Sequence, residues 1–253
     1  MPFSASPPPP SRIRWRRGRV TATGRRGRDS LELTVEVPDE GALKALAYPS
    51  LVGIPQVDDE VLLNTTALAQ GLGTGGVALV VAVPDRLPPD PEGPGHLVKA
   101  RYTPLQVTVQ GVDEQETEHH ATISTADDIV GMPVVVADLH SALPAVLIGM
   151  LATDPDLKVA YVMQDGGALP AAFSRTLDTL AASLAGVVTV GQSFGGDLEA
   201  VTVHTGLLAA RHVLGADLAI VTQGPGNLGT GTPWGFSGVA AGEACNAVTV
   251  LGG

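Results

Sequence analysis

The pattern of hydrophobic and polar positions changes along this chain of 253 residues. In its first third, short runs rich in β-branched residues are separated by Gly, Asp and Pro, and residues 31–37 alternate strictly between apolar and polar side chains. Such alternation predicts a strand with one buried face. Further strands are predicted at 19–23, 61–63 and 77–83. We expect five short strands in all, forming a small SH3-like or OB-like β-barrel over residues 14–84.

From Met132 onwards, apolar runs alternate with longer helix-like stretches. This rhythm predicts strands at 133–137, 158–163, 187–190 and 218–222, and helices at 142–152, 168–184 and 197–213. Strands that are apolar throughout are typical of a parallel sheet covered by helices on both faces. We therefore expect an α/β fold over residues 132–253, with a Rossmann-like three-layer parallel sheet.

The remaining segments have compositions that favour irregular structure. Residues 1–13 are Pro-rich and are predicted to be a disordered tail, and residues 85–131 are predicted to be linker and loop. The sequence ends soon after the apolar segment 247–251, where another strand would normally follow. We therefore expect the α/β domain to be truncated at its C-terminus.

Composition points to the cytoplasm. The single cysteine, Cys245, cannot form an intramolecular disulfide, which fits a reducing compartment. No apolar run reaches the roughly 18 residues of a membrane helix, and the Arg-rich N-terminal region lacks the apolar core of a signal peptide. We expect no association with a membrane. The apolar helices and low aromatic content are compatible with a homo-oligomer.

The charge is distributed unevenly along the chain. Residues 12–28 contain eight arginines, whereas the rest of the chain has seven basic side chains against 26 acidic ones. Phosphate binding requires Lys and Arg, so the acidic body argues against a broad nucleic-acid surface there. The basic segment 12–28 is a candidate contact for nucleic acid or an acidic partner. Its alternative interpretation is a solvated tail.

Three glycine-rich loops each follow a predicted strand, at 165–167, 191–197 and 224–232. The carboxyl ends of parallel strands meet at one edge of a sheet, which is where ligands usually bind. Backbone N–H groups of glycine-rich turns can converge on a phosphate or carboxylate. The candidate ligand-binding residues are therefore Gly166, Gly167, Gln192, Gly195, Gly196, Gly224, Gly226, Gly229, Thr230, Gly231 and Thr232.

Carboxylates are expected at the same edge. Asp138, Asp165 and Asp197 each follow a predicted strand, and His140 lies close behind the first of them. The carboxylates are candidates for general acid or base catalysis or for holding Mg²⁺ beside a phosphate, and His140 is a candidate proton carrier. Alternatively, the aspartates cap helices, which applies best to Asp197.

Residues 191–195 match the G-x-S-x-G nucleophile elbow, with Ser193 as the candidate nucleophile. The acids and histidines that follow lie mostly within the next predicted helix, too close to Ser193 to complete a triad. A tight turn of small residues is the competing interpretation. Residues 224–229 match G-x-G-x-x-G by letter, but no helix is predicted to begin there and direct its dipole at a phosphate.

Several longer motifs resemble a bacterial family of unknown function that occurs mainly in Gram-positive bacteria. The matching stretches are Asn64–Thr66 with Gly71–Gly76, Gly95–Gln106, Gly195–Val201 and Gly229–Thr232. The resemblance runs from about Arg19 to the end. It implies a cytoplasmic protein and a longer C-terminus, and it brings no activity.

These patterns lead to a hypothesis and two alternatives. We expect a site for a small anionic or phosphorylated ligand at the carboxyl edge of the α/β sheet. The first alternative is a ligand-responsive module that binds nucleic acid or protein through the barrel and residues 12–28. The second is a serine hydrolase that uses Ser193. The sequence does not decide whether the protein is an enzyme.

Overall fold

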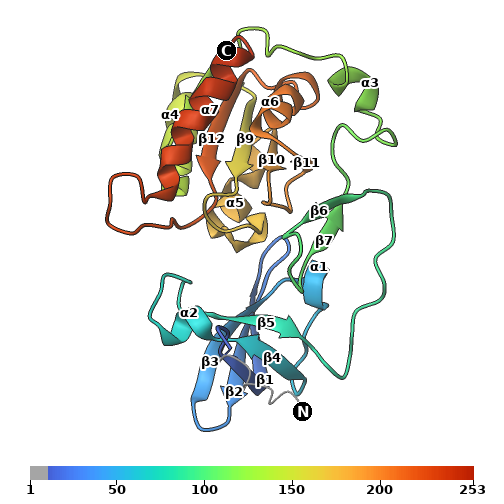
Figure 1. The fold of residues 1–253 in the computed structure, drawn as a ribbon, viewed down its shortest axis with the longest axis vertical. Coiled ribbons are helices and arrows are strands. Elements are labelled where there is room, and N and C mark those ends of the chain that lie inside the picture. The colour runs from blue at the N-terminus through green and yellow to red at the C-terminus, as the bar shows by residue number, and fades with distance from the viewer. Residues whose placement is uncertain (1–10) are drawn as a thin grey trace, which may run out of the picture. The chain divides into compact units, whose positions relative to one another are not determined.

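The structure is a computed structural model that describes residues 11–253 (Figure 1). Its contacts divide the chain into two compact units, of which the first ends at Asp90 and the second begins at Pro91. Of the tail predicted at 1–13, residues 1–10 lie outside the described residues.

The first unit is built on a closed β-barrel with strand order β1-β2-β3-β5-β4. Its strands are β1 (Trp15–Arg26), β2 (Leu31–Val37), β3 (Gly41–Ala47), β4 (Glu60–Asn64) and β5 (Ala78–Ala82). Two single-turn helices accompany them, α1 (Pro49–Val52) and α2 (Thr66–Ala69). The expectation of five strands closing into a barrel is confirmed, although β1 is longer than the strand predicted at 19–23.

Alternation along β2 explains how the barrel fills its interior. Leu33 and Val35 point inward and are almost completely buried, whereas Glu36 between Val35 and Val37 is exposed. Gly18 of β1 faces the same interior, where an added Cβ would lie 2.5 Å from the Val35 side chain. A small residue at position 18 therefore lets β1 approach the core closely.

The second unit contains a five-stranded sheet in the order β11-β10-β9-β12-β8, with all neighbouring pairs parallel. Its strands are β8 (Val134–Val136), β9 (Val159–Gln164), β10 (Gly186–Val190), β11 (Leu198–Ala200) and β12 (Leu218–Gln223). The parallel sheet expected from the apolar strands is confirmed.

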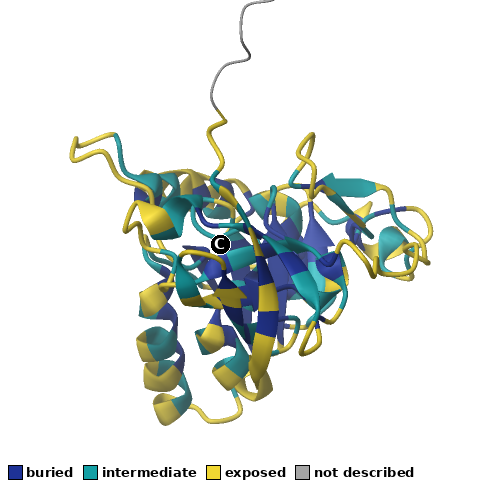
Figure 2. Cartoon of the chain, turned by 90° about the horizontal axis from the view of Figure 1, so that it is seen from below, coloured by how far each residue is buried: buried dark blue, intermediate teal, exposed yellow. Residues whose placement is uncertain are grey.

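Helices cover both faces of this sheet. On one face Tyr161 of β9 packs in a cluster with Leu147, and on the other Val162 packs in a cluster with Leu207. The first face carries α4 (Leu143–Thr153) and α5 (Arg175–Leu180), and the second carries α6 (Val203–His212) and α7 (Ala240–Val250). Figure 2 shows the resulting buried interior beneath an exposed outer layer.

The long helix predicted at 168–184 is wrong. The chain stays extended at Pro170, and the Ser174 hydroxyl accepts a hydrogen bond from the Leu177 amide, so that α5 begins only at Arg175. The segment is broken into short pieces because its backbone bonds elsewhere: the Ala171 amide donates to the Phe194 carbonyl. The 3₁₀ turns here and elsewhere are η1 (His140–Ala142), η2 (Ala171–Phe173), η3 (Ala181–Ser183) and η4 (Ser237–Val239).

The helix predicted at 197–213 begins too early. Residues 198–200 form β11, which pairs with β10, and α6 starts at Val203 behind the N-cap Thr202. The Thr202 hydroxyl accepts a hydrogen bond from the Thr205 amide, which satisfies one of the unpaired donors at the helix start.

Three short elements lie in the region predicted as linker and loop. They are β6 (Leu97–Lys99), which pairs with β7 (Val107–Val109) as a hairpin, and α3 (His120–Ile123). The final helix α7 was also not predicted. Within residues 11–253, none of the helices combines the length and apolar character needed to cross a bilayer.

Candidate functional site

The loops that follow β8, β9, β10 and β12 meet at one edge of the parallel sheet, which we call the carboxyl edge. It carries the exposed carboxylates of Asp138 and Asp165. Gln223 at the end of β12 connects two of the loops, because its Nε2 donates to the Asp138 carbonyl (2.6 Å) and its Oε1 accepts from the Ser237 hydroxyl (2.7 Å). The loops therefore form one hydrogen-bonded surface.

The glycine loops after β9 and β12 pack directly against each other. The Ala168 amide donates to the Pro225 carbonyl at 3.0 Å. A Cβ on Gly167 would overlap the carbonyl oxygen of Gly224, and a Cβ on Gly224 would overlap that of Ala168. Glycine is thus required at both positions by close backbone approach rather than by flexibility.

Four backbone amides on these two loops have no hydrogen-bond partner among the described residues: those of Gly166, Gly167, Gly226 and Asn227. Gly226 adopts a positive φ of 78°, and an added Cβ there would meet nothing within 4 Å. Such N–H groups, grouped on two touching loops, are suited to an anion.

Further along the β12 loop, the predicted residues form an exposed tip. The Thr230 amide donates to the Gly235 carbonyl at 2.8 Å, and the hydroxyls of Thr230 and Thr232 lie 3.2 Å apart. Gly229 and Gly231 are exposed beside them. These four residues belong to the same loop as Gly226 and Asn227.

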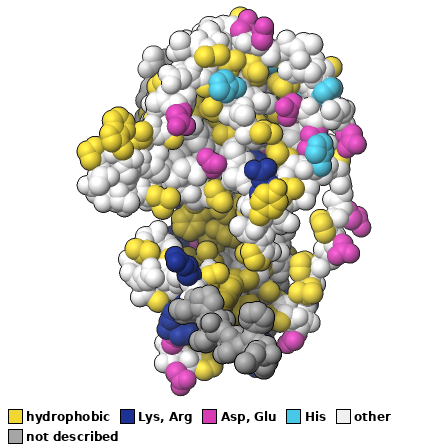
Figure 3. Space-filling view, in the orientation of Figure 1, with side chains coloured by type: hydrophobic (Ala, Val, Ile, Leu, Met, Phe, Trp, Pro, Cys, Tyr) yellow, Lys and Arg dark blue, Asp and Glu magenta, His cyan; other side chains and the backbone are white. Residues whose placement is uncertain are grey.

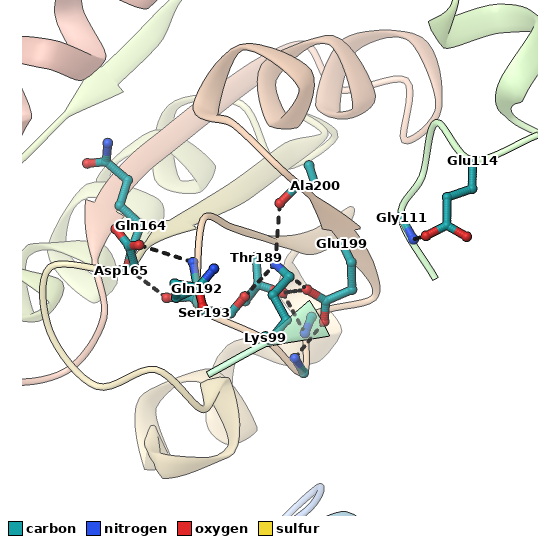
Figure 4. A network of polar contacts seen from close by, with 12 residues as sticks. Lys99, Gly111, Glu114, Gln164, Asp165, Thr189, Gln192, Ser193, Glu199 and Ala200 are labelled. Atoms are coloured by element: carbon teal, nitrogen blue, oxygen red, sulfur yellow. Dashed lines mark hydrogen bonds and ion pairs between the residues drawn. The ribbon is translucent and has the colours of Figure 1, made fainter. Parts of the chain in front are cut away.

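A buried lysine fixes the loop after β10 (Figure 4). Lys99 of β6 is fully buried, and its ammonium donates to the carbonyl oxygens of Ser193 (2.7 Å) and Ala200 (3.3 Å). Its Nζ also lies 3.2 Å from the Glu199 carboxylate. Because three acceptors surround its three N–H donors, Lys99 acts as an anchor rather than as a nucleophile.

Glu199 is equally well satisfied. Its carboxylate accepts hydrogen bonds from the Thr189 hydroxyl (2.7 Å) and the Gly195 amide (2.6 Å). Burial raises the pKa of Glu199, while Lys99 and these two donors oppose that rise. Burial lowers the pKa of Lys99, and Glu199 opposes that change. The geometry supports an ion pair that holds the 191–196 turn in one conformation.

The hairpin is tethered to the carboxyl edge by a second route. The Arg101 amide donates to the Gln192 side-chain oxygen at 3.0 Å, and the Gln192 amide donates to the Asp165 carboxylate at 3.0 Å. The turn after β6 contains two non-glycine residues with positive φ, Ala100 (48°) and Tyr102 (65°). Backbone conformations of this kind cost free energy and concentrate at functional sites.

Glu114 secures the ends of the hairpin. Its side chain is nine per cent exposed, and its Oε1 accepts from the amides of Gly111 (3.1 Å) and His96 (3.2 Å). Its Oε2 lies 3.2 Å from the His96 imidazole Nδ1. Glu114 thus joins the start of β6 to the segment that follows β7.

His140 is buried beneath the carboxyl edge rather than exposed on it. Its ring nitrogens bond to the hydroxyls of Tyr161 (2.9 Å) and Ser174 (2.7 Å), and the Tyr161 hydroxyl continues to Thr222 (2.7 Å). Burial lowers the pKa of His140 to about 4, so the imidazole is neutral near pH 7. The network links η1, β9, β12 and the N-cap of α5.

Ser193 is fully buried, and its hydroxyl donates to the Gln164 carbonyl at 3.1 Å. The next element is β11, so the strand–turn–helix context of a nucleophile elbow is not present. Among residues 11–253, Ser193 makes no hydrogen bond to a histidine. This geometry favours the tight-turn interpretation over the hydrolase alternative.

Asp197 lies at the opposite end of the strands from Asp138 and Asp165. Its carboxylate accepts from the Val187 amide at 2.8 Å, beside the start of β10. The neighbouring Gly196 donates to the Thr189 hydroxyl, and an added Cβ there would lie 2.7 Å from the Val187 carbonyl. Asp197 therefore helps the chain return to begin β11.

No group of three or more His, Cys, Asp or Glu is placed to hold a metal ion within the described part of the chain. Sequence reasoning did not select Lys99, Glu199 or Tyr161 as site residues. A lone lysine inside the apolar run Leu97–Ala100 was the available signal, because an unpaired lysine is rarely buried.

Residues 44–253 match a protein-family model. The matching family is described as "Protein of unknown function (DUF3866)". The chain belongs to this family. No curated protein and no solved structure matches it. The resemblance to a family of unknown function is thereby confirmed. Membership of the DUF3866 family assigns no activity to this chain.

Proposed function

We propose that the second unit binds a small anionic molecule, such as a phosphorylated metabolite, at the carboxyl edge between the loops after β9 and β12. One observation carries the proposal: the amides of Gly166, Gly167, Gly226 and Asn227, on two loops that touch, have no hydrogen-bond partner among the described residues. Several N–H donors directed at one anion are the usual basis of a backbone phosphate site.

Strand order supports this location. β9 and β12 are neighbours, yet the chain leaves β9 toward α5 on one face and leaves β12 toward α7 on the other. In Rossmann-like sheets, the class we propose for this unit, such divergence marks the point where ligands bind. For the barrel we propose the SH3-like or OB-like class.

Arg101 supplies a positive charge to this side of the unit. The second unit has sixteen acidic side chains and five basic ones: Lys99, Arg101, Lys158, Arg175 and Arg211. Figure 3 shows acidic side chains spread over its visible face. The exposed Arg101 guanidinium lies 5.4 Å from the Tyr102 ring centroid and has no carboxylate partner among the described residues. It is free to meet an anionic group.

Asp138 and Asp165 add negative charge to the site. Exposed carboxylates disfavour a bare anion, so the ligand's charged group is expected at the amides and its hydroxyl or amine groups at the carboxylates. Mg²⁺ bound to a phosphate is an alternative occupant of the carboxylates. We propose binding and orientation, with no covalent step, and a cytoplasmic location in keeping with the single cysteine.

Ligand-induced stabilisation of the full chain tests the proposal. Inorganic phosphate, nucleotides and sugar phosphates are added with and without Mg²⁺, and unfolding is followed by differential scanning calorimetry. A ligand at about 100 times its Kd stabilises by about 2.7 kcal/mol, which raises Tm by about 5 to 10 °C in a unit of this size.

Paired variants locate the site. Gly226→Asp places a negative charge beside the amides and is expected to abolish the shift, whereas the neutral Gly226→Asn retains it, because Asn tolerates positive φ. Arg101→Gln is expected to weaken binding, whereas Lys158→Gln, at the opposite end of β9, is not. Equal effects within each pair, or no shift with any of these ligands, would refute the site.

A further inference from the structure

The first unit has a hollow of about 440 Å³ on the surface of its barrel. It is lined by residues 11–16, which lead into β1, and by Thr66, Ala69 and Gln70 of α2 and its end. The lining is held in place, since the Arg14 amide donates to the Thr66 hydroxyl at 2.8 Å and the Thr65 amide donates to the Arg14 carbonyl at 2.9 Å.

The hollow carries a net positive charge. The guanidinium of Arg14 lies 2.9 Å from the Glu40 carboxylate, to which Arg16 also bonds. These arginines, Arg16 foremost, lower the pKa of Glu40, so the carboxylate stays ionised. Arg12 has no partner among the described residues. Three cations and one anion leave two positive charges.

Trp15 gives the hollow an aromatic surface. It is 41% exposed, and the neighbouring Ile13 is 38% exposed. A hollow lined by both arginines and an exposed tryptophan suits single-stranded nucleic acid, in which bases stack on the ring and phosphates meet the cations. An acidic peptide would use the cations but would gain nothing specific from the indole.

We propose that this hollow is a binding site for single-stranded nucleic acid, with Trp15 stacking on a base and Arg12 contacting a phosphate. Arg14 and Arg16, whose combined charge exceeds that of Glu40 by one, contact a second phosphate. The chain as a whole has a net charge of −11, so long-range attraction is absent and binding depends on these local contacts. This site lies in the first unit and is independent of the proposed ligand site.

Salt dependence follows from the charge. Two released counterions correspond to a slope of about −1.4 in a plot of log affinity against log salt concentration, since each contributes about −0.7 for a single strand. Arg12→Gln is expected to reduce the slope to about −0.7. Trp15→Leu is expected to weaken binding about tenfold, as loss of one stacked base would, with the slope unchanged.

The assay is fluorescence anisotropy of the full chain with a labelled oligothymidylate of about 15 nucleotides. Two control variants outside the hollow are compared with variants inside it. Lys44→Glu is the control for Arg12→Glu and tests for a general effect of charge. Trp234→Phe is the control for Trp15→Phe and tests for a general effect of losing a tryptophan. In the Trp234→Phe background, Trp15 fluorescence is expected to be quenched on binding.

The proposal is overturned if no binding occurs at low salt. It is also overturned if Lys44→Glu weakens binding as much as Arg12→Glu, or if poly-glutamate quenches Trp15 as effectively as the oligonucleotide does. Circular dichroism of each variant checks that the barrel remains folded.

Discussion

Removal of the buried ammonium group by Lys99→Met tests how the second unit is held together. Met has a similar length and no charge. The substitution deletes the bonds to the Ser193 and Ala200 carbonyls, and it leaves the Glu199 carboxylate, whose side chain is nine per cent exposed, without a counter-charge.

The expected cost is large because one member of a buried pair is lost while the other remains. Such changes destabilise by about 3–5 kcal/mol. In a unit of this size each kcal/mol lowers Tm by about 2–4 °C, so Tm is expected to fall by about 6–20 °C. Adding Glu199→Gln removes the stranded charge and should restore about half of the loss.

The pH dependence has a defined sign. Burial already raises the native pKa of Glu199, and loss of Lys99 raises it further. The native state of the variant therefore takes up a proton more readily than the unfolded state as pH falls. The loss of stability relative to the unsubstituted protein is expected to be smaller at pH 5 than at pH 7.

Urea unfolding followed by far-UV circular dichroism at these two pH values measures the effect. Lys158→Met, at an exposed lysine, is the control and should change stability by less than about 0.5 kcal/mol. The reasoning fails if Lys99→Met costs no more than this control, or if Glu199→Gln restores nothing.

Three further predictions concern the carboxyl edge and its support. Gly167→Ala should destabilise the second unit severely because the new Cβ overlaps the Gly224 carbonyl. Gly242→Ala, in open space within α7, should stabilise it by about 1 kcal/mol. Thermal unfolding compares the two variants, and equal effects would contradict the packing. Burial lowers the pKa of His140 to about 4, so the protein should lose stability as pH falls from about 6.5 to 4, because the unfolded state binds the proton first. His140→Gln should abolish this part of the pH dependence. An NMR titration of His140 with its midpoint near pH 6.5 would disprove the burial argument. Ser193→Ala should cost about 1 kcal/mol for the lost bond to Gln164 and leave any esterase activity unchanged, so a loss of esterase activity on a simple ester would restore the hydrolase alternative.

The parts of the fold governed by local periodicity were predictable. Strict alternation in residues 31–37 specified a barrel strand with one buried face, and the apolar runs from Met132 onwards specified a parallel sheet. Those features follow from how each short segment divides between core and solvent. Closure of the barrel was predicted from the number of strands and the tight turns between them.

What the sequence could not reveal depends on contacts between distant segments. Lys99 and Glu199 are 100 positions apart, and only the folded sheet brings the ammonium and carboxylate together. The predicted helix at 168–184 failed because the Ala171 amide bonds to Phe194 on another loop, which no local pattern encodes. Asp197 looked like Asp165 in sequence, yet the return of the chain into β11 moves it to the other end of the strands.

Closure of the barrel limits the ways in which the first unit can acquire partners. β1 is hydrogen-bonded to β4 over residues 15–19 and to β2 over residues 19–26, so each half of the strand already has one side engaged in the sheet. A partner that contacts the outward side chains of β1 leaves these backbone bonds undisturbed. Substitutions at its outward positions can change binding preference while the backbone ladder stays intact, which makes this strand a surface on which specificity can diverge without loss of the fold.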